Sequence, residues 1–261
     1  VSTTYDKIKQ SIENMPDATV VLNADCPLTY SLKDYCGGKV VTFGVDADFN
    51  DSLLSDNRFC PKCNSLLEYR SRVLAQLGSF FCPKCGYKHT APDFSVSSII
   101  EITVEGSSFV MNEELITISL GGIYNVYNYV CAVAGLSALK INTFKSIGNF
   151  NGAFGRLERF KNGNHTVTLM LVKNPVGLSN CIKYSSKMTM PFDLAIALND
   201  NDADGRDVSW IWDADFTPLT LKSLKAYTIG KRAFDMALRL KYAEIPVENV
   251  IDGEDYYRLI N

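Results

Sequence analysis

The amino-acid sequence predicts an α/β protein that carries a small cysteine-rich insertion. Short apolar runs alternate with helical stretches along most of the chain, which is the pattern of strands and crossover helices. Two identical CPKC units interrupt this pattern in the first half. The length of 261 residues and the 46% hydrophobic content are sufficient for one large domain or two ordinary ones.

The first half begins with helical spacing of Ile8 and Ile12, which predicts a helix from Tyr5 to Met15. Beyond it, apolar runs rich in β-branched residues predict short strands. These strands are expected at Ala18–Leu22, Lys39–Phe43, Ile99–Val104, Phe109–Met111 and Leu115–Ile118. A helix rich in small residues is expected at Asn125–Leu139, with Gly121 and Gly122 marking its start.

The second half alternates strands with helices, which predicts a parallel sheet. Strands are expected at Thr166–Val172, Leu194–Leu198 and Ala226–Ile229, and helices at Pro175–Tyr184 and Arg232–Tyr242. The polar, glycine-containing segment from Lys140 to Asn151 is the expected boundary. We therefore expect two domains, 1–141 and 142–261, with the insertion at about 56–92 of the first.

The charge balance excludes some classes of partner. Lys and Arg total 26 against 29 Asp and Glu, so the net charge of −3 gives no general reason to bind nucleic acid or an anionic membrane. No apolar run approaches the roughly 20 residues that span a bilayer, and the start of the sequence lacks the pattern of a signal peptide. We expect a cytoplasmic protein with reduced cysteines and no transmembrane segment.

Four cysteines have the spacing of a zinc ribbon. Each CPKC unit is followed by Asn or Gly, and two such knuckles can bring four thiolates around one tetrahedral Zn²⁺. A redox dithiol is the alternative, but it would use a single C-x-x-C. Four protein ligands leave no open position on the metal, so the zinc is expected to be structural. The predicted ligands are Cys60, Cys63, Cys82 and Cys85.

His89 and the four other cysteines of the chain are not among the predicted zinc ligands. His89, just beyond the second knuckle, is expected at the surface. Four further cysteines lie in apparent core segments, namely Cys26, Cys36, Cys131 and Cys181.

An acidic segment, Leu198–Phe216, follows a predicted strand and contains six aspartates. Ligands of open parallel sheets bind beyond the carboxyl ends of the strands, so this segment is a candidate site. A solvated loop and a calcium loop are the alternatives, although no Glu stands at the twelfth position that an EF-hand requires. Trp210 and Trp212 are expected to anchor the core.

Two helix starts could contribute polar ligands. KNPVG, which begins at Lys173, joins a strand to a helix and could offer free N–H groups to an anion. Asn125 and Asn128 lie one turn apart, and helix capping explains at least one of them equally well. No complete phosphate-binding loop is present, and the two histidines of the chain do not support a self-contained catalytic triad.

Taken in order, the motifs resemble one family. They are LNADCP, the double CPKC, the two asparagines, FGR at Phe154–Arg156, LVKNPVG and NDNDADGRDVSWIWDADF. Together they resemble the Mur ligases, and most closely the MurT branch, over essentially the whole chain. Cys26 stands where that family has Asp in LNADDP.

The resemblance implies a fold and a position within it. It implies the remainder of a Mur ligase central ATPase domain with an inserted Cys₄ ribbon, followed by a Rossmann-like C-terminal domain. By the same resemblance the chain begins after the P-loop, so we expect this stretch alone to be inactive.

The resemblance also implies an ATP- and Mg²⁺-dependent carbon–nitrogen ligase of peptidoglycan synthesis. It would amidate the D-glutamate α-carboxylate of lipid II at the inner face of the membrane. Ammonia would come from a GatD-like glutaminase that forms a heterodimer with it. The matching residues are Asn125 and Asn128 near adenine, Arg156 and Lys173 near phosphate or substrate, and Asp207 as the third member of the glutaminase triad.

Two other functions stay open at this point. A Mur-type ligase could use an amino acid in place of ammonia, although the DGRDVSW segment argues against it. A non-catalytic zinc-ribbon interaction module would use no ATP, but the ribbon is only a small part of the chain.

Overall fold

The computed structural model describes residues 2–47, 59–103, 106–141, 156–220 and 223–252. Its internal contacts divide the chain into two compact units, Val1–Asn151 and Gly152–Asn261. Each unit is described by itself. Most of the boundary segment expected from the sequence lies outside the described residues.

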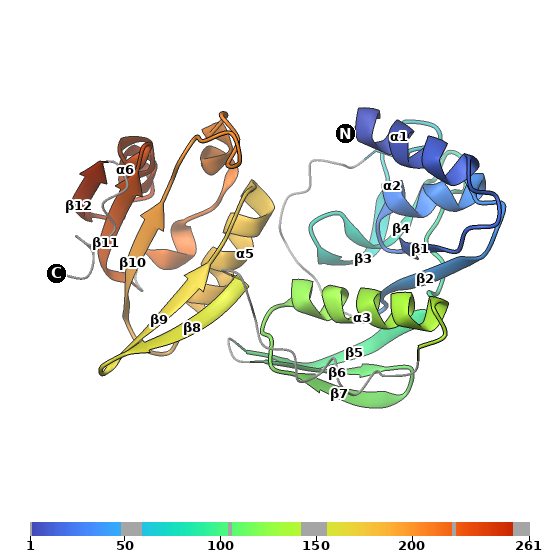
Figure 1. The fold of residues 1–261 in the computed structure, drawn as a ribbon, viewed down its shortest axis with the longest axis horizontal. Coiled ribbons are helices and arrows are strands. Elements are labelled where there is room, and N and C mark those ends of the chain that lie inside the picture. Colours follow the sequence, from blue (N-terminus) through green and yellow to red (C-terminus); the bar gives the residue numbers. More distant parts are fainter. Residues whose placement is uncertain (1, 48–58, 104–105, 142–155, 221–222, 253–261) are drawn as a thin grey trace. The chain divides into compact units, whose positions relative to one another are not determined.

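The first unit is built on a five-stranded mixed sheet with the order β1, β2, β5, β6, β7 (Figure 1). Strands β1, β2 and β5 run parallel, whereas β5, β6 and β7 form an antiparallel meander. The strands are β1 (Val20–Asn23), β2 (Val40–Val45), β5 (Phe94–Ile102), β6 (Ser107–Met111) and β7 (Glu114–Ile118). The chain between β2 and β5 contains the cysteine-rich insertion.

Helix α3 (Ile123–Ala138) packs on this sheet and closes its core. Val126, Val130, Val133 and Ala134 recur at helical spacing and are buried, and they contact β-branched and aromatic residues of the strands. The helix begins after Gly122, whose φ of 94° lies in the left-handed region.

A second, smaller cluster lies beside β1. Ile12 of α1 (Ser2–Glu13) packs there with Leu22 and Leu32. The turn that follows β1 contains α2 (Pro27–Tyr30) and the 3₁₀ helix η1 (Ser31–Tyr35).

The second unit contains an antiparallel hairpin and a parallel sheet (Figure 1). The hairpin is formed by β8 (Arg156–Asn162) and β9 (His165–Met170). The sheet has the order β10 (Phe192–Ala197), β11 (Ser223–Gly230), β12 (Val247–Asp252). The other elements are α5 (Pro175–Ser186), η2 (Ser209–Asp213), η3 (Thr217–Leu219) and α6 (Ala233–Tyr242).

The core of the second unit joins its helices to its sheet. Leu178 and Ile182 of α5 pack with Met236 and Leu240 of α6 and with residues of the segment after β10. The parallel direction of β10 and β11 confirms the prediction for the two later strands of this unit. The strand expected at Thr166–Val172 is different, because it pairs antiparallel with β8 and not with the parallel sheet.

Among the described residues, no helix is both long and apolar enough to cross a membrane.

Candidate functional site

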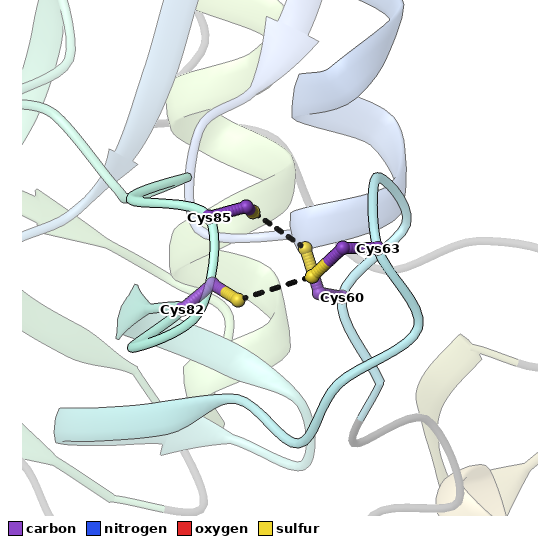
Figure 2. A group of neighbouring side chains, drawn as sticks. All are labelled: Cys60, Cys63, Cys82 and Cys85. Carbon is purple, nitrogen blue, oxygen red and sulfur yellow. Dashed lines mark hydrogen bonds between the residues drawn. The ribbon is translucent and has the colours of Figure 1, made fainter.

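The four predicted zinc ligands come together at the base of the insertion (Figure 2). The insertion is a hairpin of β3 (Glu68–Leu74) and β4 (Leu77–Phe81), and one CPKC loop precedes β3 while the other follows β4. The four sulfur atoms lie within 4.8 Å of one another. Two of the contacts are drawn in Figure 2, Cys60 to Cys85 at 3.6 Å and Cys63 to Cys82 at 3.5 Å.

Both CPKC loops have the same local geometry. The N–H of Asn64 donates to the carbonyl of Cys60, and the N–H of Gly86 donates to that of Cys82. Asn64 and Gly86 have φ values of 55° and 75°, in the left-handed region that Gly adopts freely and Asn tolerates. This is why each second cysteine is followed by one of these two residue types. The repeated turn aims all four thiols at a common centre.

The donor set fits tetrahedral zinc. A Zn–S bond of about 2.3 Å places tetrahedral sulfur atoms roughly 3.8 Å apart, close to the two distances given above. Cys60 and Cys82 are buried, whereas Cys85 is exposed. Hydrogen bonds from Ser65 lower the pKa of the Cys63 thiol to about 6. At Cys85 a hydrogen bond with the Tyr87 backbone lowers the pKa, but desolvation and three neighbouring thiols raise it to about 12.

A buried carboxylate fastens this insertion to the sheet. Asp25, two residues after β1, has no exposed surface. Its Oδ2 accepts hydrogen bonds from the Val45 N–H at 2.7 Å and from the Tyr127 hydroxyl of α3 at 2.6 Å. Its Oδ1 lies 2.9 Å from Nε2 of His89, and its backbone carbonyl accepts the N–H of Gly78 in the hairpin. One residue thus joins the sheet, the helix and the insertion.

His89 is therefore not at the surface, and that prediction was wrong. Its side chain is almost fully buried against Asp25 and packs edge-on against the Phe80 ring. The sequence contains a histidine near the second knuckle but gives no signal that its partner lies 64 positions away. Burial and the Asp25 charge raise the pKa of Tyr127 well above its usual value, so its hydroxyl remains a donor.

The acidic segment lies where the sequence predicts it, directly after β10 and at the carboxyl edge of the parallel sheet. The turn after β11 holds this segment in place. Gly230 has a φ of 104°, and a Cβ there would lie 2.4 Å from the Leu198 carbonyl oxygen. The backbone N–H of Lys231 then donates to the Asn199 side chain at 3.0 Å. The close approach that glycine permits thus connects the two segments.

Asp207 is exposed and ionised on this loop. Its Oδ1 accepts the backbone N–H of Ser209 at 2.8 Å, and these hydrogen bonds from Ser209 hold the pKa of the Asp207 carboxyl below its usual value. The carboxyl is one wall of an open pocket of about 250 Å³. The pocket is lined by Arg206, Asp207, Val208, Ser209, Ile211, Trp212, Arg232 and Asp235.

Two arginines that line this pocket form ion pairs with nearby aspartates. Arg232 contacts Asp235 at 2.7 Å and Asp200 at 3.2 Å. Arg206 contacts Asp202 at 3.0 Å. With several carboxylates already paired to arginine, the arrangement differs from an open cage of ligands for calcium.

The other predicted site residues are distributed over both units. Asn125 is buried and donates through Nδ2 to the Gly121 carbonyl, while Asn128 is exposed and donates to Asn125. Lys173 lies beyond β9 and donates to the Ala203 carbonyl of the acidic loop at 3.1 Å. Arg156 is the first residue of β8, and its side chain lies outside the described residues.

The KNPVG segment starts α5 as expected. Asn174 is the N-cap, and its side chain accepts the Gly177 N–H at 2.7 Å. Asn125, in contrast, is no cap, because its side chain donates to a carbonyl.

Two expectations about burial were wrong. Trp212 is about half exposed and does not anchor the core, whereas Trp210 packs partly against it. Cys131 is exposed, and Cys26, Cys36 and Cys181 are only partly buried. Cys26 accepts a hydrogen bond from Thr29 one turn later, so it contributes locally to the turn after β1.

Comparison with known proteins gives two matching family models. The model described as MurT ligase C-terminal matches residues 171–261. A zinc-ribbon model described as RNA polymerases M/15 Kd subunit matches residues 58–94, around the four cysteines.

A curated relative from Streptococcus pneumoniae is named lipid II isoglutaminyl synthase (glutamine-hydrolyzing) subunit MurT. It is 35% identical over 268 residues, covering 100% of this chain and 60% of the relative. The chain therefore spans about three fifths of that protein's length.

Solved structures share the fold. A pseudomurein peptide ligase type C from Methanothermus fervidus has a TM-score of 0.71 at 21% identity, covering 94% of this chain and 48% of the other. A MurF ligase from Thermotoga maritima in complex with ADP has a TM-score of 0.54 at 10% identity, covering 95% of this chain and 47% of the other. At these identities the likeness concerns the fold alone.

Proposed function

Because this chain belongs to the Mur ligase family, on its MurT branch, we propose that it is the synthetase part of a glutamine-dependent amidotransferase. The proposed substrate is the α-carboxylate of D-glutamate in lipid II, and the product is D-isoglutamine. The reaction would take place at the cytoplasmic face of the membrane during peptidoglycan synthesis. The name of the Streptococcus pneumoniae relative supports this assignment.

The chemistry requires two steps. A carboxylate does not react with ammonia, because its oxygen is a poor leaving group. Transfer of the γ-phosphoryl group of ATP to that oxygen gives an acyl phosphate. Attack by ammonia then forms the C–N bond and releases inorganic phosphate. Mg²⁺ would neutralise the charge on the phosphates.

The single observation that carries the proposal within this chain is the position of Asp207. It is an exposed, ionised carboxylate, oriented by the Ser209 N–H, at the edge of a pocket. A glutaminase needs such a carboxylate to orient its histidine and to stabilise the imidazolium that forms. We place Asp207 as that third triad member, with the nucleophilic Cys and the His supplied by a GatD-like partner in a heterodimer.

For the nucleotide we propose contacts on the first unit. Asn128 is the exposed member of the asparagine pair, so it would face adenine, and Asn125 would fix its orientation through their hydrogen bond. Arg156 and Lys173 of the second unit are proposed to contact phosphate or substrate. The MurF ligase solved with ADP supports a nucleotide in this fold.

We assign structural zinc to Cys60, Cys63, Cys82 and Cys85. Four thiolate ligands at tetrahedral spacing leave no coordination position for a substrate or a water. The metal would therefore hold the insertion together and would take no part in amidation.

The test is glutamine hydrolysis by this chain mixed with a GatD-like glutaminase, measured as glutamate released. This readout needs Asp207 and the partner but no ATP. We expect the pair to hydrolyse glutamine and Asp207→Asn to lower the rate by about 10⁴, as loss of a triad carboxylate does elsewhere.

Asp202→Asn is the matched control, since Asp202 lies in the same loop and contacts only Arg206 among the interactions described. Its rate should equal that of the unmodified pair. Failure of the two proteins to associate, or normal hydrolysis by Asp207→Asn, would disprove the proposal.

A further inference from the structure

The ribbon has one buried face and one face that is open to solvent. On the buried face, residues such as Phe80 pack with Tyr30 of α2. Successive side chains of a strand point to opposite faces of a sheet. The alternate residues Leu66, Glu68 and Arg70 are all exposed, so they share the open face.

Strand pairing adds further side chains to the open face. Phe59 lies directly opposite Leu66, and Phe81 lies opposite Glu68. Lys88 in turn lies opposite Phe81. Residues that are directly opposite in an antiparallel pair point to the same side. The outer ribbon face, as we call it, therefore consists of Phe59, Leu66, Glu68, Arg70, Phe81 and Lys88.

The outer ribbon face has an apolar centre. Phe59, Leu66 and Phe81 are 51%, 60% and 41% exposed, although all three are large apolar side chains. They are brought together by the strand pairing of one small hairpin. A group of apolar side chains that a monomer leaves exposed in this way marks an interaction site.

Cations surround this apolar centre. Arg70 and Lys88 belong to the face, and Lys84 is exposed on the CPKC loop that follows Phe81. None of these three cations forms an ion pair with a residue that the structure describes. Glu68 is the single acidic residue of the ribbon sequence between Phe59 and Thr90. The ribbon is thus locally basic, although the whole chain has a net charge of −3.

We propose that the outer ribbon face docks on the surface of an anionic lipid bilayer. Apolar side chains enter the interface between headgroups and acyl chains, and neighbouring lysines and arginines are attracted to anionic headgroups. The charge of the ribbon is complementary to that surface, and its apolar centre matches the interface beneath it.

A nucleic acid would also attract the cations, but Leu66 is the most exposed of the three apolar side chains and offers no ring on which a base could stack. The combination of an aliphatic centre and a cationic surround therefore favours a bilayer. Neither Asp207 nor the glutaminase enters this assignment. Docking would bring the chain to the surface that holds its proposed lipid substrate.

The experiment is sedimentation of this chain with lipid vesicles. One set of vesicles contains equal parts of phosphatidylcholine and phosphatidylglycerol, and the other contains phosphatidylcholine alone. We expect the chain to sediment with the anionic vesicles and to remain in solution with the neutral ones. Added sodium chloride should weaken the binding, because it screens the attraction between exposed charges.

Substitutions on the outer ribbon face should change this binding in both directions. Leu66→Asp places a charge in the apolar centre and should weaken binding at least tenfold. Arg70→Glu and Lys88→Glu should each weaken it about fivefold or more. Glu68→Gln removes the negative charge that opposes an anionic surface, so it should strengthen binding. A residue that only stabilised the fold would give no such gain.

Two matched controls lie elsewhere in the chain. Leu115→Asp introduces the same charge at an apolar residue that is 67% exposed on β7, at the edge of the sheet. Lys187→Glu reverses the charge of an exposed lysine of the second unit. Both should leave vesicle binding unchanged.

Hydrogen exchange in β3 and β4 verifies that each variant keeps its ribbon. It should not change, since the substituted side chains are exposed. Glutamine hydrolysis with the GatD-like partner involves no membrane, so every variant should hydrolyse glutamine at the unmodified rate.

Three outcomes would overturn the docking surface. They are failure of the unmodified chain to sediment with anionic vesicles, equal sedimentation with both kinds of vesicle, and equal losses in the ribbon variants and the controls. Displacement of the anionic vesicles by a single-stranded oligonucleotide that binds more tightly would also overturn it, in favour of nucleic acid. None of these measurements uses glutamine or the partner, so failure of the docking surface is distinguishable from failure of the proposed function.

Discussion

The buried carboxylate of Asp25 connects three parts of the first unit. It receives hydrogen bonds from β2 and α3 and contacts His89 at the exit of the ribbon. A buried charge is tolerated only when its partners satisfy it. Each of these partners therefore contributes to the stability of the unit and fixes the ribbon against the sheet.

His89→Ala tests that contribution. Removing one partner of a buried carboxylate leaves part of its desolvation uncompensated, at a cost of about 1–3 kcal/mol. We expect the urea midpoint of the first unit, followed by circular dichroism, to fall accordingly. Tryptophan fluorescence, which reports on the second unit, should not change. His165→Ala is the matched control, because His165 is exposed, and an equal effect there would refute the argument.

A substitution at Gly44 in β2 tests the packing around the same Asp25 carboxylate. A Cβ at Gly44 would lie 2.4 Å from Oδ1 of Asp25, so Gly44→Ala must displace the carboxylate and should destabilise by about 1–3 kcal/mol. Gly135 in α3 has no neighbouring heavy atom within 4 Å of such a Cβ. Gly135→Ala should therefore stabilise by about 0.5–1 kcal/mol, as alanine does in helices. Effects of the same sign in both variants, measured in urea, would contradict this account.

At the scale of single residues, the sequence predicts local turns and contacts between residues that are close in the chain. Cys60 and Cys63 form one local turn, and the repeat at Cys82 and Cys85 predicts the second half of the centre. The Asp25 to His89 contact joins positions that no local pattern relates. The exposure of Trp212 could not be predicted either. Tryptophan is a large, mostly apolar residue that is usually buried, and Trp212 is exposed because of where η2 places it in the fold.

At the scale of elements, helices and apolar strands were predicted well, whereas strands with several charged residues, such as β8 and β12, were not. The predicted helix at Arg232–Tyr242 corresponds to α6 within one residue. Strand β8 has the sequence RLERFKN, and its charged residues obscure the alternation of apolar and polar residues that would predict a strand paired with β9. Strand β12 is an edge strand with VENVID, and its polar residues face solvent on both sides of the core position Ile251. Tertiary pairing, not local preference, forms both strands.

The ribbon is an element whose small core should depend on the proposed zinc. Its interior consists of cysteines and aromatic rings, among them Phe80 and Tyr87, packed against Tyr30 of α2. Without zinc, these few side chains must support the hairpin alone. Structural zinc supplies about 10 kcal/mol or more of apparent binding free energy, so its loss should unfold the hairpin locally while the two sheets persist.

We therefore predict one zinc per chain, measured by elemental analysis of protein purified without added metal. Chelation should increase hydrogen exchange in β3 and β4 and leave α6 unchanged as an internal control. Because protons compete with the metal for the four thiolates, zinc affinity should fall as the pH is lowered. A stably folded, metal-free ribbon would contradict the assignment.

At the scale of the molecule, the residues proposed for nucleotide binding and for glutamine hydrolysis lie in different units. The asparagine pair proposed for the nucleotide lies in the first unit, and the carboxylate proposed for glutamine hydrolysis lies in the second. Amidation then requires two chemistries that can be supplied separately, since added ammonia replaces the glutaminase product. This separability makes the role of Asp207 measurable in the intact complex.

Asp207→Asn in the assembled synthetase and glutaminase complex should abolish amidation of lipid II with glutamine and preserve amidation with ammonium salts. The amide keeps an oxygen that can accept the Ser209 N–H, so the loop should keep its structure. It removes the negative charge that a histidinium requires, and triad variants of this kind lose about 10⁴ in turnover. Asp202→Asn controls for loss of charge on the same loop and should retain both activities. Equal loss of the glutamine and ammonia reactions would assign Asp207 to the synthetase site or to folding, and retention of both would remove it from the triad.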